Sequence, residues 1–380
     1  MTKYKSPGRP ATTFLFIPFL VMLVGGCSDS SDSTPNMPDD DTLMNQVQYL
    51  GTHNSYHVRP RDALFDLLLS YDRDLTESVN YTHIPLQQQF ETQGIRQIEL
   101  DVFDDPQGGI YANPFGRLVS DEAAPGIPEL DEPGLKVLHV QDVDYETTCY
   151  TFVSCLQEIK TWSDGHPGHL PITVLVEAKD EPFDPLNFGF AVPLEFGPEA
   201  LDRIDTEIRS VFPAERLIVP DNVRGDFATL EAAVLTQGWP RLSEARGKIM
   251  FALDNGGAIL DNYIVGHTSL EGRVLFTNSP VGTPEAAFIK LNDPLAALAE
   301  IETRVAQGYM VRTRADADTL QARNGDTTRR DAALNSGAHF ISTDYPVPNP
   351  EFSDYQVTIP GGGIARCNPI NPGNCNPELL

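Results

Sequence analysis

The chain has 380 residues and a formal net charge of −27 at pH 7, with 54 acidic against 27 basic residues. Such acidity argues against nucleic acid as a partner, because a strongly anionic protein and a phosphate backbone repel each other. A ligand that carries a phosphate must therefore meet a local positive centre, which a bound divalent metal can supply.

The first 27 residues predict an export signal. Three basic residues precede an apolar run from Phe14 to Val24, which is too short to span a bilayer as a mature helix. The run ends in Leu-Val-Gly-Gly-Cys27, which resembles the cleavage box of bacterial lipoproteins, whose cysteine is acylated. We expect a lipoprotein signal at 1–27, a lipid on Cys27 and a solvated, Ser-, Asp- and Pro-rich tether at 28–44. The alternatives are an ordinary secretory signal and an uncleaved anchor.

The rest of the chain alternates short apolar runs with helical patterns. The expected strands are 47–50, 95–102, 136–140, 172–177, 248–253, 288–291, 309–312 and 339–342. Apolar residues at three- and four-residue steps predict helices at 148–162, 198–211, 294–307 and 327–336. Near-continuous apolar strands fit a parallel sheet covered on both faces. We expect an α/β protein with one distorted (β/α)8 TIM-like barrel at 45–350 and a Pro-rich tail at 351–380; a doubly wound open sheet is the alternative.

Four cysteines besides Cys27 form two close pairs in the sequence, Cys149 with Cys155 and Cys367 with Cys375. In an exported protein the economical interpretation is two local disulfides. Four cysteines allow three pairings, and the sequence alone excludes none of them. A zinc site is the competing interpretation, but these spacings differ from those that zinc sites favour.

The ends of the first two expected strands carry residues suited to chemistry. His53 and Asn54 come after the first strand and a Gly-Thr pair that can turn the chain, and Glu99 and Asp101 stand two apart on the second. Residues two apart on a strand point to the same face, so these two carboxylates converge. Their repulsion is costly in an interior unless a cation lies between them, and hard oxygen ligands select calcium or magnesium. A half-exposed strand face with basic neighbours is the structural alternative.

The next two expected strands end in a similar way. His139 closes the third, and Glu177 and Lys179 close the fourth. In a barrel the carboxyl ends of all strands face one mouth, where the active sites of this fold are built. Alone, His139 would more often be a hydrogen-bonded core residue and Glu177 a surface charge. Lys179 could contact a phosphate or form a salt bridge with Glu177, and Arg312, at the end of a late strand, is a further candidate for substrate binding.

Taken together these residues resemble the calcium-dependent phosphoinositide-specific phospholipases C, and more closely their secreted bacterial members. The shared features are a His-Asn pair, a Glu-x-Asp strand, a second histidine and a later glutamate in this order, and segments 309–318 and 336–345 look like the closing strands of the bacterial relatives. The resemblance implies a catalytic pair of His53 and His139. It also implies one Ca²⁺ ion held by Asn54, Glu99, Asp101 and Glu177.

The implied reaction is cleavage of phosphatidylinositol to diacylglycerol and a cyclic inositol phosphate, which is then hydrolysed or not. Calcium would lower the pKa of the inositol 2-hydroxyl and neutralise the phosphate. Glu99 or Asp101 would take the proton, His53 would contact a phosphoryl oxygen, and His139 would act as general acid. No obvious Lys/Arg cluster serves ring phosphates, so we expect unphosphorylated phosphatidylinositol to be preferred. The lipid on Cys27 would hold a monomeric enzyme on the envelope of its own bacterial cell.

Two other functions remain open at this stage. A glycerophosphodiester phosphodiesterase or phospholipase-D-like barrel also uses two histidines, a Glu-x-Asp pair and a divalent metal, but usually opens with His-Arg where this chain has His53-Asn54. A catalytically silent lipoprotein could bind inositol lipids through the same mouth.

Overall fold

The computed structural model describes residues 41–119, 126–185 and 187–380. The expected signal, Cys27 and residues 28–40 of the expected tether lie outside this part of the chain. Within it, a 3₁₀ turn, η1, spans Met44–Gln46, and Thr42 and Met44 are buried. The packed part of the chain therefore starts slightly before residue 45.

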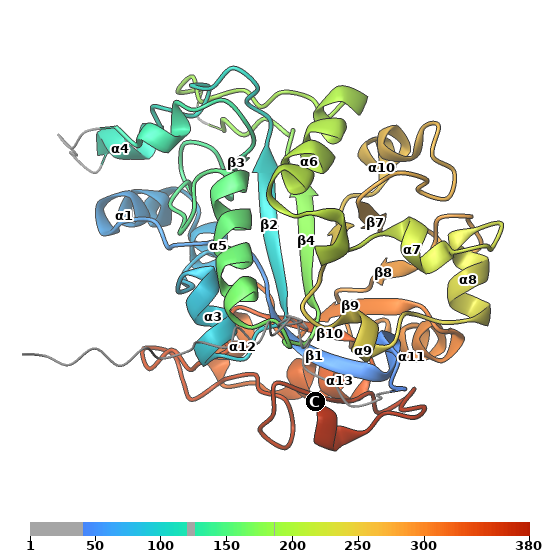
Figure 1. The fold of residues 1–380 in the computed structure, drawn as a ribbon. Coiled ribbons are helices and arrows are strands. Elements are labelled where there is room, and N and C mark those ends of the chain that lie inside the picture. Colours follow the sequence, from blue (N-terminus) through green and yellow to red (C-terminus); the bar gives the residue numbers. More distant parts are fainter. Residues whose placement is uncertain (1–40, 120–125, 186) are drawn as a thin grey trace, which may run out of the picture. The chain divides into compact units, whose positions relative to one another are not determined.

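Eight parallel strands form one curled sheet (Figure 1). The strands are β1 (Val47–Thr52), β2 (Gln97–Phe103), β4 (Ile172–Ala178), β6 (Ile249–Leu253), β7 (Leu275–Thr277), β8 (Phe288–Lys290), β9 (Met310–Arg314) and β10 (Phe340–Thr343). Their order runs from β7 through β6, β4, β2, β1, β10 and β9 to β8. A parallel bridge between Asn278 and Phe288 then joins the end of β7 to β8. The α/β, TIM-like barrel prediction is confirmed.

One expected strand is shorter than expected and lies outside the parallel barrel, and one barrel strand was missed. The segment 136–140 contributes only β3 (Lys136–Val137), which pairs antiparallel with the end of β2 and is not part of the parallel barrel. Its apolar pattern has another cause, because Leu138 is buried in a small separate cluster with Phe103 and Tyr145. The missing barrel position belongs to β7, which is only three residues long, and a short β5 (Leu217–Ile218) adds to the edge of β6.

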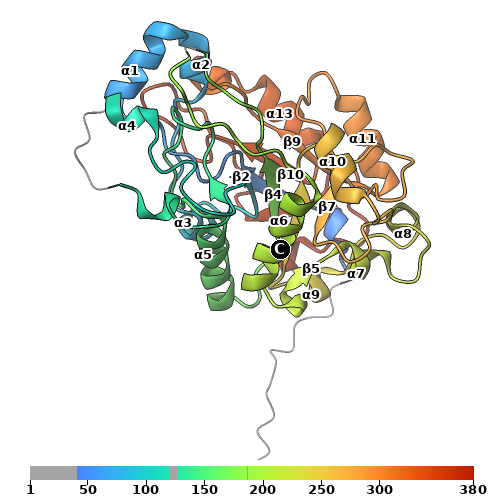
Figure 2. The same ribbon diagram turned by 90° about the horizontal axis from the view of Figure 1, so that it is seen from above.

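Helices surround the strands, as the view in Figure 2 shows. Those described are α1 (Asp62–Tyr71), α2 (Arg73–Ser78), α3 (Leu86–Thr92), α4 (Phe115–Val119), α5 (Phe152–Gly165), α6 (Pro198–Val211), α7 (Pro220–Arg224), α8 (Leu230–Thr236), α9 (Leu242–Ala245), α10 (Gly257–Ile264), α11 (Leu298–Gln307), α12 (Leu320–Asn324) and α13 (Thr328–Asn335), with 3₁₀ turns η2 (Pro128–Leu130), η3 (Ala214–Arg216) and η4 (Pro377–Leu379). The four expected helices correspond to α5, α6, α11 and α13. None of the helices in the described part of the chain combines the length and the apolar character that crossing a membrane requires.

Local sequence explains how these layers form. The hydroxyl of Thr151 accepts from the backbone N–H of Ser154, which caps the start of α5. On β2 the residues of even number face this helix layer, and the guanidinium of Arg96, just before the strand, stacks over the ring of Trp162 at 4.8 Å. The residues of odd number, including Glu99 and Asp101, therefore face the barrel interior.

The C-terminal segment is built into the sheet. A short strand, β11 (Ala365–Cys367), pairs antiparallel with the first half of β1, opposite the edge that β10 occupies. Because β11 covers the first half of this edge of β1, only the second half can pair with β2. Strands β1 and β2 therefore pair only between Gly51 and Gln97. This distorts the barrel, as expected. Both expected disulfides, Cys149–Cys155 and Cys367–Cys375, are present, and the second links β11 to the chain after it.

Candidate active site

The strand ends gather the candidate residues at one end of the barrel. His53 and Asn54 follow β1, Glu99 and Asp101 lie on β2, and Glu177 lies on β4, beside Asp101 in the strand register. Asn54 has a φ of +42°, in the left-handed region that asparagine tolerates better than most residues. The backbone thus turns sharply as soon as β1 ends.

Close approach of β1 to β2 requires a glycine. A Cβ atom on Gly51 would lie 2.0 Å from Oε1 of Gln97, far inside contact distance. Gln97 Oε1 in turn accepts from the hydroxyl of Ser342 on β10, so the side chain is not free to move away. Gly51 therefore sets the position from which His53 and Asn54 leave the strand.

Carboxylates crowd together in the mouth. One oxygen each of Glu99, Glu177 and Asp254 lies within 4.8 Å of the others. Asp254, which directly follows β6, is a member that the sequence interpretation missed. Among the described residues, no hydrogen-bond donor reaches either oxygen of Asp101, Oδ1 of Asn54 or Oδ1 of Asp254, although all four atoms are buried. Buried oxygen atoms without donors are costly, and carboxylate and amide oxygens are the ligands of Ca²⁺, so these residues fit a calcium ion.

The protonation behaviour of the cluster agrees with a place for a cation. Burial raises the pKa of Glu99 to about 7, against the opposing effect of Arg312. Burial, followed by the nearby charge of Glu177, also raises the pKa of Asp101 well above its usual range. A divalent cation among these groups would favour their ionised forms and lower both pKa values.

The basic side chains at this end are already paired. Nζ of Lys179 lies 3.5 Å from Oδ2 of Asp101 and 3.8 Å from Oε2 of Glu177. Burial alone would lower the pKa of this lysine, but the two carboxylates raise it above its usual value. Nζ of Lys290, at the end of β8, lies 2.5 Å from Oδ2 of Asp254.

Arg312 lies deeper than expected. Its side chain is 1% exposed and donates to Ser342 Oγ at 2.9 Å, to Asn292 Oδ1 at 2.6 Å and to Glu99 Oε2 at 2.5 Å. All of the guanidinium nitrogens are thus engaged within the barrel. Arg312 thus holds the carboxylate of Glu99 through a hydrogen bond inside the barrel, whereas the sequence suggested a contact with the substrate.

A buried carboxylate holds His53. Nδ1 of His53 lies 2.9 Å from Oδ1 of Asp344, which directly follows β10, and Arg314 on β9 lies 3.3 Å from the other oxygen. Nε2 of His83 donates to the His53 carbonyl oxygen at 2.9 Å. Burial lowers the pKa of His53 well below its usual value, and Arg314 and the nearby His139 lower it further. The contact to Asp344 leaves Nε2 of His53 available to a substrate.

His139 is held in the same manner. Its Nδ1 lies 2.7 Å from Oδ2 of Asp144, and the other oxygen of Asp144 lies 2.9 Å from Nε2 of the fully buried His57. Burial would raise the pKa of Asp144, but the two histidines hold it below its usual value. Asp144 is therefore ionised at neutral pH, and Nε2 of the 22% exposed His139 side chain is the nitrogen that can meet a substrate. The loop after β3, and not a barrel strand, carries this histidine.

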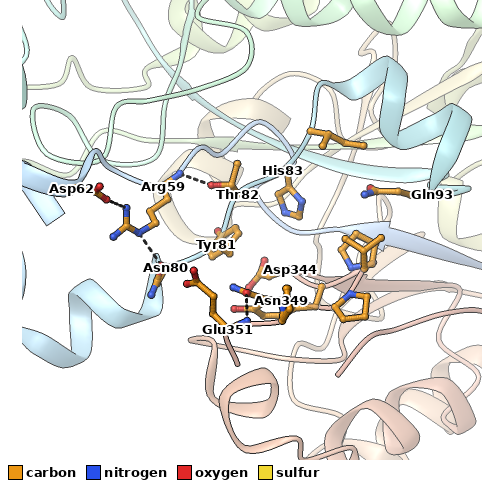
Figure 3. Close-up of a pocket in the computed structure, with 16 residues that line it drawn as sticks. Arg59, Asp62, Asn80, Tyr81, Thr82, His83, Gln93, Asp344, Asn349 and Glu351 are labelled. Carbon is orange, nitrogen blue, oxygen red and sulfur yellow. Dashed lines mark hydrogen bonds and ion pairs between the residues drawn. The ribbon is translucent and has the colours of Figure 1, made fainter. Parts of the chain in front are cut away.

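A polar cavity of about 620 Å³ lies next to the residues that support His53 (Figure 3). Its wall includes Tyr81, His83 and Asp344, and Arg59 and Asn80 form a hydrogen-bonded pair at another part of the wall. His83 and Asp344 both contact His53, so the cavity reaches two of the residues that support this histidine.

Some of the site residues that the sequence analysis missed could have been predicted from the sequence, and others could not. Asp254 directly follows the expected strand 248–253, and Asp344 comes two residues after the end of the expected strand 339–342, so the rule that served for His53 could have found them. Asp144 and His57 lie in loops that are far apart in the sequence and meet only in the folded chain. No local sequence pattern predicts their contact.

Two histidines held by carboxylates and an oxygen-rich acidic cluster at the mouth of a parallel barrel suit the metal-assisted phosphodiesterases of the TIM-barrel class. The chain belongs to the Ca²⁺-dependent phosphoinositide phospholipase C family, whose model matches residues 42–369. The match spans the chain from η1 to β11 and includes every site residue described above. The recognition made from the sequence is confirmed.

Solved structures show weaker likenesses. The calcium-dependent phosphoinositol-specific phospholipase C of a Gram-negative Pseudomonas species is 17% identical, with a TM-score of 0.49 over 86% of this chain and 96% of that chain. The Ca²⁺-dependent phosphatidylinositol-specific enzyme of Streptomyces antibioticus is also 17% identical, with a TM-score of 0.49 over 80% and 95%. A glycerophosphoryl diester phosphodiesterase from Parabacteroides distasonis has 14% identity and a TM-score of 0.31 over 81% and 86%. A comparison with curated protein sequences finds no match. The family assignment therefore rests on the family model.

Proposed function

We propose that this protein cleaves phosphatidylinositol to diacylglycerol and a cyclic inositol phosphate, with one Ca²⁺ ion at the acidic cluster. The observation that carries the proposal is the set of buried, donor-free oxygens on Asn54, Asp101 and Asp254, flanked by two histidines that buried carboxylates hold. Asn54, Glu99, Asp101 and Glu177 are the proposed ligands, and Asp254 adjoins them. When bound, calcium would acidify the attacking inositol hydroxyl and neutralise the phosphate.

Asp101 is the better of the two candidate proton acceptors on β2. Oε2 of Glu99 accepts from Arg312, and this contact weakens the basicity of that carboxylate. Asp101 has a cationic neighbour too, but Nζ of Lys179 stands farther away, at 3.5 Å from Oδ2, and burial raises the pKa of Asp101 well above its usual range. Asp101 can therefore accept the proton of the inositol 2-hydroxyl more readily than Glu99 can.

The two histidines serve opposite ends of the phosphodiester. Asp144 accepts from Nδ1 of His139 and provides a counter-charge for the imidazolium form of this ring, in which Nε2 carries a second proton that can pass to the leaving alkoxide. His53 and Asp344 form a pair at 2.9 Å, and Nε2 of His53 can donate to a phosphoryl oxygen once this pair takes up a proton. Each of these proton-transfer groups should contribute roughly a hundred- to ten-thousandfold in rate.

The pairing of charges favours a headgroup without additional phosphates. Four basic side chains near the cluster each have a carboxylate partner, and none of these four is free to receive a ring phosphate. The pairs are Lys179 with Asp101 and Glu177, Lys290 with Asp254, Arg312 with Glu99, and Arg314 with Asp344. A higher kcat/KM on the bisphosphate than on phosphatidylinositol would contradict this preference.

The proposed setting is the bacterial cell envelope. The lipoprotein signal at 1–27 and the acylated Cys27 would anchor a monomer through the tether, and the two disulfides suit an oxidising compartment outside the cytoplasm. Metabolic labelling with a fatty-acid analogue, compared between the natural chain and Cys27→Ala, tests the anchor.

Phosphorus NMR of phosphatidylinositol turnover tests the reaction and the metal together. We expect a cyclic inositol phosphate signal that requires calcium, disappears in excess EGTA and returns when calcium is restored. Glycerol 3-phosphate as the phosphorus product would instead support a glycerophosphodiesterase. Unchanged turnover by His139→Ala would remove that residue from the mechanism, and absence of turnover by the natural chain would favour a silent binding protein.

A further inference from the structure

An apolar groove opens beside His139. Its volume is about 200 Å³, and it lies between α1, α2, the start of α4 and the segments 139–144, 183–185 and 188–190. The side chains that line it are Leu67, Leu68, Tyr71, Asp72, Leu75, Thr76, Val79, Phe115, His139, Val140, Val143, Asp144, Phe183, Pro185, Phe188 and Phe190. We call this set the apolar groove.

The polar residues of the apolar groove direct their polar atoms elsewhere. The carboxylate of Asp72 accepts from the N–H of Leu75 and caps α2, and the hydroxyl of Thr76 donates to the Asp72 carbonyl oxygen. Asp144 is occupied by His57 and His139. The surface that remains toward the groove is therefore almost entirely carbon, so a polar ligand would lose its hydration there without gaining partners.

The rim of the apolar groove is open to solvent. Tyr71 is 48% exposed, Leu75 is 50% exposed and Phe188 is 53% exposed. Phe188 also stacks on Phe115 at 4.9 Å between ring centroids, so the aromatic wall is ordered by contacts of its own. An apolar cavity of about 150 Å³ in a protein stays dry and takes up benzene, and the apolar groove is larger than that. Its size suits a short length of hydrocarbon.

We propose that the apolar groove binds hydrocarbon of the leaving group, namely the first part of an acyl chain of diacylglycerol. This proposal rests on the proposed function, because it assumes that His139 protonates the leaving oxygen. The leaving oxygen must lie at His139 Nε2 to receive a proton, and His139 is also part of the groove wall. The leaving group continues outward from that oxygen, so the apolar groove is the surface that its hydrocarbon meets.

This arrangement predicts a dependence on acyl length that needs no membrane. Burial of one methylene should raise kcat/KM about fourfold until the groove is full. The dependence should be present for single substrate molecules in solution, since the groove is part of the protein and not of a lipid surface.

The experiment compares glycerophosphoinositol with dibutanoyl- and dihexanoyl-phosphatidylinositol, each below its critical micelle concentration. The variant Leu75→Gln makes the rim of the apolar groove polar, and Leu295→Gln is its matched control, because Leu295 is similarly exposed at 54% but lies outside the groove. Leu67→Gln, also at an exposed position of the lining, provides a second variant in case Leu75→Gln folds poorly. Release of inositol phosphate gives kcat/KM for every pair.

We expect kcat/KM of the natural chain to rise from glycerophosphoinositol to the dihexanoyl lipid. Leu75→Gln should lose roughly three- to tenfold on the dihexanoyl lipid and nothing on glycerophosphoinositol, whereas Leu295→Gln should match the natural chain on both. Equal losses on both substrates, or an unchanged length dependence, would overturn the proposal. If the length dependence is absent below the critical micelle concentration and appears only when the dihexanoyl lipid is then raised above it, the rim serves docking on a lipid surface and the proposal is overturned too. If no inositol substrate is cleaved at all, the proposed function itself fails.

Discussion

Replacement of Asp144 by asparagine isolates the role of the carboxylate that holds His139. Asp144 is buried and ionised, and it accepts from His139 at 2.7 Å and from His57 at 2.9 Å. Asparagine keeps the shape of the side chain but removes the charge, and its amide nitrogen must face one of the two rings. The imidazolium of His139, which the general-acid step requires, then loses its counter-charge.

The size of the effect follows from the contact that is lost. A hydrogen bond to a charged group contributes about 1.5–3 kcal/mol. At 1.36 kcal/mol per pH unit, the alkaline limb of the pH profile of kcat should move down by about one to two pH units. At a pH above the original limb, kcat should fall about ten- to a hundredfold, and it should recover as the pH is lowered. KM should change little, because Asp144 contacts the histidine and not the substrate.

The assay is kcat against pH on a soluble phosphatidylinositol at saturating calcium. Glu146→Gln serves as the matched control, because it removes a carboxylate two residues away that contacts Arg61 and Tyr150 but neither histidine. An alkaline limb that stays in place in Asp144→Asn, or that moves equally in Glu146→Gln, would refute the reasoning. A loss of kcat that is the same at every pH would indicate a damaged fold.

Three further outcomes are expected. Asp101→Asn should lower kcat at least a hundredfold and weaken calcium binding, as measured by calcium titration of turnover; full activity at the same calcium concentration would remove Asp101 from the site. Gly51→Ala should lower the free energy of unfolding in urea by about 1–3 kcal/mol, because its Cβ would lie 2.0 Å from Gln97 Oε1, and unchanged stability would show that the strands can separate. Burial lowers the pKa of His339 to about 4, so between pH 6.5 and 4 the unfolded chain binds more protons at this residue than the folded chain does. His339 therefore does not reduce the free energy of unfolding above pH 6.5, and it reduces this free energy progressively as the pH falls toward 4. When the pH is lowered from 6.5 to 4, the free energy of unfolding of the His339→Gln variant should fall by about 3 kcal/mol less than that of the natural chain, as measured by urea unfolding at each pH. Equal decreases in the two proteins would exclude this histidine as a contributor.

The sequence predicted best what depends on strand ends. His53, Asn54 and Glu177 stand where parallel strands finish, and in a closed parallel sheet all such positions share one mouth. Alternation along β2 placed Glu99 and Asp101 on the interior face in the same way. These inferences hold because the period of a strand is local, so no knowledge of distant contacts is needed.

Strand prediction from the sequence failed where an apolar run is buried for a reason other than a place in the barrel. The segment 136–140 has the hydrophobicity of a strand, but Leu138 fills a cluster outside the barrel, whereas the three-residue β7 is too short to show any period. The contacts of Arg312 were also out of reach of the sequence. Its position at a strand end suggested a substrate contact, and only the folded structure shows that Glu99, Ser342 and Asn292 accept a hydrogen bond from each of its three guanidinium nitrogens.

Charge pairing explains how so acidic a chain can handle an anionic lipid. The cationic side chains near the acidic cluster neutralise carboxylates beside them, Lys179 beside Asp101 and Arg312 beside Glu99, and the buried Oδ1 of Asn54 accepts no hydrogen bond from the described residues. Without a metal the mouth would repel a phosphodiester, because the remaining negative charge has no counter-ion. A bound divalent cation changes the sign of the local field only at the point where the ion lies, while the rest of the surface stays anionic. In the proposed reaction the phosphate would lie between His53 and His139, and the supporting carboxylates Asp344 and Asp144 would fix which nitrogen each ring presents to it.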